Sequence, residues 1–323
     1  MVAEQDRKVR VAVVGAGSFG RHHLRVLKQS AKAELLAVLD PNPERAHAAA
    51  AEFGCAVVTD LPHLPGLVEA AVVAAPTSAH AEIGCALLEM GLDLLIEKPI
   101  AADRLSARRL VETAERHGRI LQIGHLERFN PGVAALKSIV NVPLFFEVHR
   151  LSLFSPRSLD VDVVLDLMIH DLDIVLDMVG EIPSEVRAAG LIILSGKVDI
   201  ANVRLAFPGG CVANLTASRV STERVRKLRL FQPHQYISLD YERQQAAAFT
   251  VSEHQRIGFE DLKVEKQEPL RLEVESFLDS VRTRQAPRVS GRDGLRALDI
   301  ALDILDKIEE HTRLVSQRLK SLP

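Results

Sequence analysis

The stretch KVRVAVVGAGSFG, residues 8–20, decides the fold of the first half of the chain. Residues 8–14 form a β-branched apolar run, which is typical of a buried strand. The glycine pattern GAGSFG follows at once, and residues 21–29 then continue with a helical spacing of apolar side chains. A strand, a glycine-rich turn and a helix in this order predict a dinucleotide-binding site.

The chemistry of phosphate binding explains the glycines of this turn. Gly15 permits the tight turn, Gly17 lets the backbone approach a pyrophosphate, and Gly20 lets the helix pack closely on the strand. The helix N-terminus adds amide donors and the positive end of a dipole. The cofactor residues expected in the turn are Gly15, Gly17, Ser18, Phe19 and Gly20.

Asp40 lies directly after a second apolar run, at residues 33–39. A carboxylate at this place accepts hydrogen bonds from the hydroxyls of the adenosine ribose and repels a 2′-phosphate. The sequence therefore predicts NAD as the cofactor in preference to NADP. Arg45 would weaken that preference if its side chain folded back over the site.

Strand-like and helix-like segments alternate through the rest of the first half. This alternation indicates βαβ units and predicts a Rossmann domain, an α/β fold with a doubly wound parallel sheet, over residues 1–123. The further strands are expected at residues 70–75, 93–96 and 120–124, and the helices at residues 43–54, 79–90 and 105–117.

The pattern changes near Gly124, where long strand-like runs begin to follow one another. The turn signal Pro-Gly-Gly at residues 208–210 separates two of them. This favours an α+β domain with a largely antiparallel open sheet over residues 124–323. Its strands are expected at residues 144–154, 185–194, 200–207, 212–220, 227–236 and 246–253, and its helices at 163–179, 272–283 and 293–319.

The composition is that of an ordinary globular protein, with 47% hydrophobic and 26% charged residues and a formal net charge of −3. The chain has no long basic block, which argues against a nucleic-acid partner. Its apolar runs are too short to cross a membrane, and its first residues lack the apolar core of a signal peptide. Cys55, Cys85 and Cys211 lack metal-ligand spacing, so we expect reduced packing residues in a cytoplasmic protein.

The tripeptide Glu97-Lys98-Pro99 follows a predicted strand. Together with the glycine-rich turn, the antiparallel second domain and the segment PRVSGRDGLRA at residues 287–297, it resembles the Gfo/Idh/MocA oxidoreductases. The resemblance implies an NAD-dependent enzyme in which Lys98 reaches both the nicotinamide ribose and the substrate. It also implies further cofactor contacts from Pro76, Thr77, His80 and Glu97.

Asp166 and His170 lie four residues apart in a predicted helix, so their side chains share one face. The spacing resembles the family's aspartate and histidine pair, in which the histidine takes the proton of the alcohol being oxidised. An imidazole suits this role because it titrates near neutral pH. Asp166 would orient the ring, stabilise its cationic form or bind the substrate. This chemistry requires no metal, and the pair His22-His23 lacks partners at ligand spacing.

The stretch GHLERFNP, residues 124–131, lies at the expected domain junction. It resembles the subgroup of the family that oxidises the 3-hydroxyl of UDP-N-acetylglucosamine during the synthesis of amide-linked lipid A. Substrate contacts are expected from His125, Glu127, Arg128 and Asn130, in addition to Lys98, Asp166 and His170. In the alternative interpretation, Arg128 and Phe129 cap a helix and pack the junction. Further candidate partners for a diphosphate are Arg150, Arg157 and Arg219.

The sequence is compatible with three functions. The leading one is oxidation of a nucleotide-linked amino sugar, and the second is oxidation of a free cyclitol or monosaccharide. The third is an NAD-binding sensor without turnover, a role in which Lys98, Asp166 and His170 would not be needed together. The apolar strands of the second domain also predict a homodimer or homotetramer formed through its sheet.

Overall fold

The computed structural model describes residues 7–154, 161–251 and 256–320. The chain divides into two compact units, Met1–Leu126 with Glu268–Arg296, and Glu127–Gln267 with Ala297–Pro323. The break at Leu126 lies beside the domain boundary expected at residue 124. The segment Glu268–Arg296, expected in the second domain, belongs instead to the first unit, because its apolar side chains complete the core of that unit.

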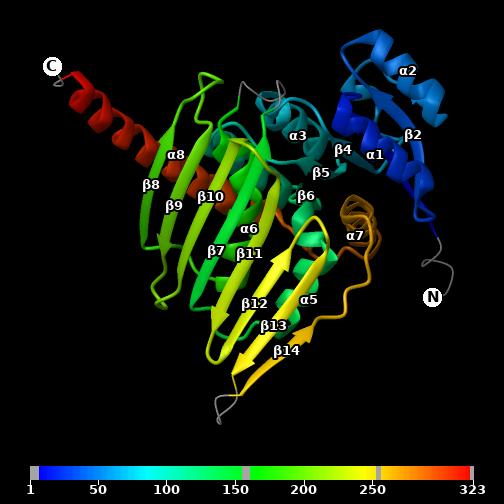
Figure 1. Ribbon diagram of the computed structural model, residues 1–323. Helices are drawn as coiled ribbons and strands as arrows, with labels where there is room; N and C mark the ends of the chain where they lie inside the picture. Colours follow the sequence, from blue (N-terminus) through cyan, green and yellow to red (C-terminus); the bar gives the residue numbers. More distant parts are fainter. Residues whose placement is uncertain (1–6, 155–160, 252–255, 321–323) are drawn as a thin grey trace. The chain divides into compact units, whose positions relative to one another are not determined.

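The first unit is built on a parallel sheet of six strands in the order β3-β2-β1-β4-β5-β6 (Figure 1). This is the order of a dinucleotide-binding Rossmann sheet, in which the strand sequence reverses beside β1. The strands are β1 (Val9–Val14), β2 (Ala33–Leu39), β3 (Ala56–Val57), β4 (Ala70–Val73), β5 (Asp93–Glu97) and β6 (Leu121–Gly124).

Helices cover both faces of this sheet. Neighbouring side chains of a strand point to opposite faces, and on β5 Leu95 joins the cluster formed with α1 and α7 while Ile96 faces α3 and α4. Phe277 of α7 is fully buried in the first of these clusters. The helices are α1 (Ser18–Gln29), α2 (Pro43–Phe53), α3 (His80–Glu89), α4 (Arg104–Arg116) and α7 (Pro269–Thr283).

The second unit is built on an eight-stranded sheet in the order β14-β13-β12-β11-β7-β10-β9-β8. β7 and β10 pair in parallel, and the other neighbouring strands pair in antiparallel fashion. The strands are β7 (Phe145–Leu153), β8 (Glu185–Leu191), β9 (Ile200–Ala206), β10 (Val212–Ser221), β11 (Val225–Gln232), β12 (Gln235–Asp240), β13 (Gln245–Val251) and β14 (Ile257–Asp261). Both predicted fold classes are thereby confirmed.

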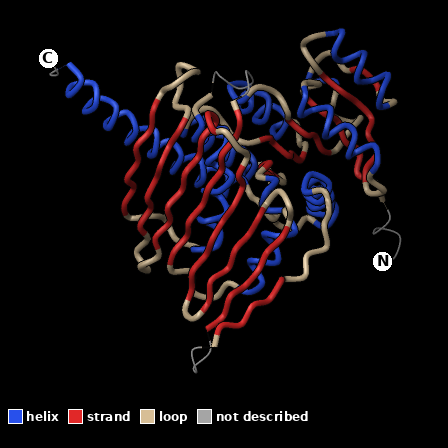
Figure 2. Tube along the Cα trace, in the orientation of Figure 1, coloured by secondary structure: helices blue, strands red, loops and turns tan. Residues whose placement is uncertain are grey.

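One face of this sheet is covered by helices and the other is open (Figure 2). Ala213, Leu215 and Ala217 alternate along β10 toward the covered face, where they pack in one core with apolar residues of the helices. The helices are α5 (Pro131–Ile139), α6 (Ile169–Val179) and α8 (Gly291–Lys320), the last of which begins in the first unit and enters the second at Ala297. Within the described ranges, no helix is both long and apolar enough to span a bilayer.

Two local predictions were wrong in detail. The strand expected at residues 227–236 is broken by the turn Pro233-His234, which connects β11 to β12 as a hairpin. His234 adopts a positive φ of 60°, a conformation more often taken by glycine or asparagine, so the sequence carried no clear turn signal. The helix expected at residues 163–179 begins with a π-helical turn, Val164–Met168, before α6.

Candidate functional site

The glycine-rich turn has the geometry that close approach of a phosphate requires. Gly15 has a φ of 103°, and a Cβ on it would lie 2.5 Å from the carbonyl oxygen of Ala74. A Cβ on Gly20 would lie 1.8 Å from the carbonyl oxygen of Gly15, so α1 can approach β1 only in its absence. A Cβ on Gly17, by contrast, would meet no atom within 4 Å. The backbone at Gly17 therefore borders open space before α1, which fits a pyrophosphate bound by the amides of this turn.

The carboxylate of Asp40, at the end of β2, is held beside the same turn. Its Oδ2 accepts the N–H of Ala16 at 2.8 Å, and its Oδ1 accepts the N–H of Asn42 at 2.8 Å. Nη2 of Arg45 lies 3.0 Å from Oδ1, so Arg45 does fold back over Asp40. Burial alone would raise the pKa of Asp40, but these donors outweigh it and hold the pKa below its usual value. An ionised acceptor at this place fits the ribose diol of NAD, while the guanidinium of Arg45 beside it weakens the preference over NADP that Asp40 alone predicts.

The EKP motif starts on the last residue of β5. The side chain of Glu97 folds toward its own backbone, and its Oε2 accepts the N–H of Lys98 at 3.3 Å. Its Oε1 lies 2.6 Å from Nε2 of His23 on α1. The peptide bond between Lys98 and Pro99 is cis. The backbone from which the Lys98 side chain extends is thus tied to the preceding carboxylate.

His80 connects the two loops that were expected along the cofactor. Its Nδ1 lies 2.9 Å from the carbonyl oxygen of Pro99, and its Nε2 lies 2.9 Å from that of Ala75. Burial lowers the pKa of His80 in spite of these acceptors. The ring is fully buried, which favours a supporting role over direct cofactor contact. Pro76 is exposed, and Thr77 is half-buried in the 3-10 turn Thr77–Ala79 that precedes α3, so both stay accessible.

In the second unit, Asp166 and His170 occupy consecutive turns where a π-helical segment changes into α6. Asp166 lies within the π turn Val164–Met168, and His170 is the second residue of α6. Asp166 is half-buried and His170 is 8% exposed. π turns inside helices occur frequently at functional sites, because the extra residue in the turn redirects side chains. The sequence predicted a shared helical face for these residues but gave no sign of the wider turn.

The residues of the GHLERFNP stretch that belong to the second unit take part in a buried polar network. Nη1 of Arg150 lies 3.0 Å from Oε1 of Glu127, and its Nε lies 2.6 Å from Oδ2 of Asp171. The guanidinium of Arg150 also lies 5.1 Å from the ring centre of Tyr241. Asn130 caps α5 through Gly132 and donates to Glu127 at 3.1 Å. Burial would lower the pKa of Arg150, but Asp171 and Glu127 raise it well above its usual value.

Arg128 forms a second buried ion pair with α6. Its Nε donates to Oδ2 of Asp173 at 2.7 Å, and its Nη1 lies 2.8 Å from Oδ1 of Asp177. The geometry therefore favours a framework role for Arg128, as it does for Glu127 and Asn130, over direct substrate contact. The residue of this stretch that caps the helix α5 is Asn130, and not Arg128 or Phe129.

The remaining candidate residues that the structure describes are buried inside their units. His125 follows β6 and is 1% exposed, and Phe129 is 2% exposed. Arg219 donates to the carbonyl oxygen of Val161 and lies 3.8 Å from Asp199, so it too is engaged inside the second unit. Arg157 lies outside the described residues.

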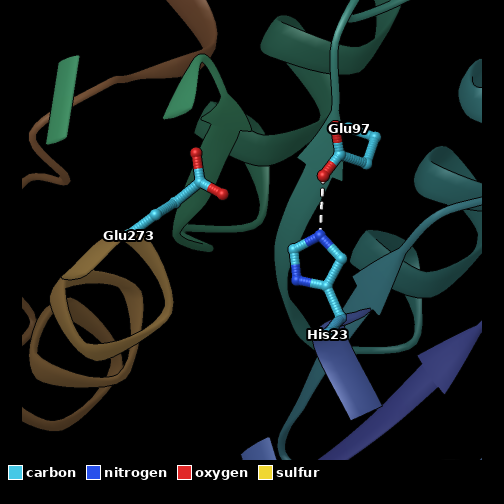
Figure 3. Close-up of side chains that lie close together, drawn as sticks. All are labelled: His23, Glu97 and Glu273. Atoms are coloured by element: carbon cyan, nitrogen blue, oxygen red, sulfur yellow. Dashed lines mark hydrogen bonds and ion pairs between the residues drawn. The ribbon is translucent and has the colours of Figure 1, made fainter. Parts of the chain in front are cut away.

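The sequence analysis missed a cluster of His23, Glu97 and Glu273, which are buried close together in the first unit (Figure 3). His23 was expected to be a solvated or packing residue. Its position on the apolar face of α1, next to Leu24, indicated burial. Glu273, which lies close to His23, is far away in the sequence, on α7, and no local pattern connects the two.

Comparisons with known proteins place the chain in a family. Residues 9–125 match the Gfo/Idh/MocA model described as "Oxidoreductase family, NAD-binding Rossmann fold", and residues 149–233 match the "GFO/IDH/MocA C-terminal domain". The chain is 35% identical over 307 residues to the UDP-N-acetylglucosamine 3-dehydrogenase of Acidithiobacillus ferrooxidans, covering 93% of this chain and 97% of the relative. It is 26% identical over 312 residues to an inositol 2-dehydrogenase of Rhizobium meliloti, covering 91% and 94%.

A solved structure leads to the same group. The structure of UDP-N-acetylglucosamine 3-dehydrogenase from Acidithiobacillus ferrooxidans matches with a TM-score of 0.89 at 34% identity, covering 94% of this chain and 99% of that one. The family model names an NAD-binding Rossmann fold, and the geometry of the glycine-rich turn fits a dinucleotide, so NAD is the cofactor. The chain therefore belongs to the Gfo/Idh/MocA family of NAD-binding oxidoreductases.

Proposed function

We propose that this chain oxidises the 3-hydroxyl of UDP-N-acetylglucosamine to a ketone. The observation that carries the proposal is the 35% identity to the UDP-N-acetylglucosamine 3-dehydrogenase of Acidithiobacillus ferrooxidans, over 97% of the length of that enzyme. The residues that the chemistry needs are present in the elements expected for them. Lys98 follows β5, Asp166 lies in the π turn Val164–Met168, and His170 is the second residue of α6.

Each of these side chains has one assigned role. His170 takes the proton of the hydroxyl, because imidazole is the side chain that best exchanges protons near neutral pH. The ammonium of Lys98 stabilises the negative charge that develops on the oxygen. Asp166 orients the imidazole and stabilises its cationic form. NAD, when bound, accepts the hydride from the carbinol carbon and so completes the redox balance.

The buried arginines support this arrangement by fixing α6. Arg150 and Arg128 bind Asp171 and Asp173, which are the first and third residues after His170. A helix held at these points presents His170 in one orientation. We therefore assign Glu127, Arg128 and Asn130 to the framework. His125 is 1% exposed and as buried as His80, so we assign it a supporting role as well.

Formation of NADH with a panel of substrates tests the function. We expect turnover of UDP-N-acetylglucosamine, with UDP-glucose and myo-inositol as comparison substrates and Lys98→Ala as the inactive control. The inositol 2-dehydrogenase relative makes the cyclitol the second candidate. Turnover of myo-inositol without turnover of any nucleotide sugar would select it. Binding of NAD without turnover of any alcohol would favour the sensor.

The open face of the second unit's sheet supports self-association. Five aromatic rings form a continuous row across β7, β11, β12, β13 and β14, with neighbouring ring centres between 4.8 and 5.8 Å apart. Phe231 and Phe259 of this row are 38% and 59% exposed. We propose that a second copy of the chain covers the row, giving a dimer or tetramer. Phe231→Asp is expected to lower the mass measured by sedimentation, and a monomeric wild type would contradict the proposal.

The surroundings of the reaction follow from its chemistry. We propose that the 3-keto nucleotide sugar is the substrate of an aminotransferase on the route to amide-linked lipid A.

We place the protein in the cytoplasm, because the free thiols of Cys55, Cys85 and Cys211 suit a reducing compartment. Fractionation of cells that express the tagged protein checks the compartment.

A further inference from the structure

One histidine and two carboxylates, contributed by three separate elements, lie together inside the first unit. His23 lies on α1, Glu97 ends β5 and Glu273 lies on α7. One nitrogen or oxygen atom of each residue lies within 4.8 Å of the others, and the carboxylate of Glu273 points toward the other two side chains (Figure 3). His23 and Glu273 are 0% exposed and Glu97 is 7% exposed. Two carboxylates so close and so deeply buried cannot both be ionised without a compensating charge.

The hydrogen bonds show which of the two carboxylates is compensated. Oε1 of Glu97 lies 2.6 Å from Nε2 of His23, and its Oε2 accepts the N–H of Lys98 at 3.3 Å. Both carboxylate oxygens of Glu273 are buried, and no donor among the described residues reaches them. Gln122 of β6 donates at 3.1 Å to the backbone carbonyl of Glu273 and not to its side chain. The charge that would compensate a second ionised carboxylate must therefore be supplied at Glu273.

Either a proton or a metal cation could supply it, and the geometry favours the proton. Two ligand atoms bound about 2.0–2.2 Å from one tetrahedral zinc ion are separated by about 3.4 Å. The 2.6 Å between His23 and Glu97 is shorter, and it has the length of a charge-assisted hydrogen bond. Burial and the negative charge of Glu97 raise the pKa of Glu273 well above its usual value.

We propose that Glu273 is a neutral carboxylic acid in the folded protein, and that His23 and Glu273 are positioning residues that hold an ionised Glu97 against the backbone of Lys98. A second negative charge at Glu273 would repel Glu97, and loss of His23 would leave Glu97 free to rotate. In both cases the N–H of Lys98 loses its acceptor. The positioning role rests on the proposed function of Lys98, whereas the neutral acid does not.

Conservative and disruptive variants at the same positions test the proposal. Glu273→Gln copies the neutral acid in shape and charge, so its unfolding midpoint is expected within about 2 °C of the wild type, while Glu273→Ala, which leaves a cavity, lowers it by about 5 °C or more. Glu97→Gln removes the ionised partner of His23 and is expected to lower kcat about 10-fold or more. The Kd for NADH should change less than about 3-fold, because the two oxygens of Glu97 are held by His23 and the N–H of Lys98 rather than offered to the cofactor, as the resemblance had led us to expect. Glu275→Gln, at a partly exposed position of the same helix, is the matched control.

Infrared spectroscopy detects the proton itself. The wild type is expected to show the carbonyl stretch of a protonated carboxylic acid, and this band disappears in Glu273→Gln. Absence of the band in the wild type overturns the neutral acid. Addition of Zn²⁺ to the protein provides the other decisive result, because one ion bound per chain and lost in Glu273→Gln would establish a cation site instead.

Failure of this inference can be told apart from failure of the proposed function. The infrared, unfolding and NADH-binding measurements need no sugar, so lack of turnover with UDP-N-acetylglucosamine would refute the substrate and leave the neutral acid standing. If the wild type turns over and Glu97→Gln has the same kcat, the positioning role is refuted.

Discussion

Arg128→Met removes a guanidinium from two carboxylates of α6 and keeps much of the apolar volume of the side chain. In the wild type, Nε of Arg128 lies 2.7 Å from Oδ2 of Asp173, and these side chains are 4% and 2% exposed. Asp177, the second partner, retains Lys137 at 2.6 Å after the substitution. The uncompensated charge therefore falls on Asp173.

The expected loss of stability follows from this burial. Removing one partner of a buried ion pair costs about 3–5 kcal/mol, because the other charge stays desolvated. At about 2–4 °C per kcal/mol for a unit of this size, the unfolding midpoint should fall by about 6–20 °C. The matched control is Arg187→Met, which removes an ion pair with Glu185 whose side chains are 76% and 51% exposed. That change should cost about 0–1 kcal/mol.

Thermal unfolding followed by circular dichroism measures both variants, and the KM for UDP-N-acetylglucosamine is determined beside it. The double variant Arg128→Met with Asp173→Asn should regain part of the lost stability, because the amide no longer carries a buried charge. An unchanged midpoint together with a raised KM would refute the framework role and make Arg128 a substrate contact.

Three further predictions concern the cofactor, the chemistry and the acid limit of stability. Asp40→Ala should weaken NAD binding and narrow its advantage over NADP in a titration followed by fluorescence; equal affinities before and after would remove Asp40 from the site. His170→Ala should lower kcat by about 10²–10⁴ while the Kd for NAD stays nearly unchanged, and a wild-type rate would exclude it as the proton acceptor. Asp199 accepts the amides of Ile193 and Leu194, and although burial alone would raise its pKa, these donors and Ser195 lower it from 3.8 to about 2. It should therefore contribute about 2 kcal/mol above pH 4, a contribution lost as the pH falls through 2. Asp199→Asn should differ from the wild type in urea unfolding by about 2 kcal/mol at pH 7 and by about half as much at pH 3.

The dinucleotide site could be predicted from the sequence because its determinants are local. Gly15, Gly17 and Gly20 lie within one turn. Gly15 and Gly20 are required by close contacts with Ala74 and with Gly15 itself, and Gly17 leaves open space for a phosphate. Asp40 ends the next strand of the same sheet, so strand order alone brings it to the glycines. The alternation of strands and helices predicted the parallel sheet for the same reason.

The parts that sequence analysis missed depend on contacts over long separations. Glu273 meets His23 only after α7 has packed on the Rossmann sheet, and nothing near residue 273 indicates this. From the sequence alone, the basic and polar side chains of the GHLERFNP stretch fit contacts with a sugar diphosphate as well as they fit a framework role. The buried partner of Arg128 is Asp173, 45 positions along the chain, and that of Glu127 is Arg150, 23 positions along. Neither pairing can be read from the sequence. The π turn at Asp166 likewise has no separate pattern, since its residues fit an ordinary helix.

The path of the chain through the two units bears on how the protein is made on the ribosome. The Rossmann core includes Leu270, Val274 and Phe277 of α7, so the side chains that close one face of the parallel sheet are translated after the whole antiparallel sheet. Domains generally fold in order of synthesis. Here α1 and α2 cover part of this face early, but the surface that α7 buries stays open while nearly half of the chain is still being translated.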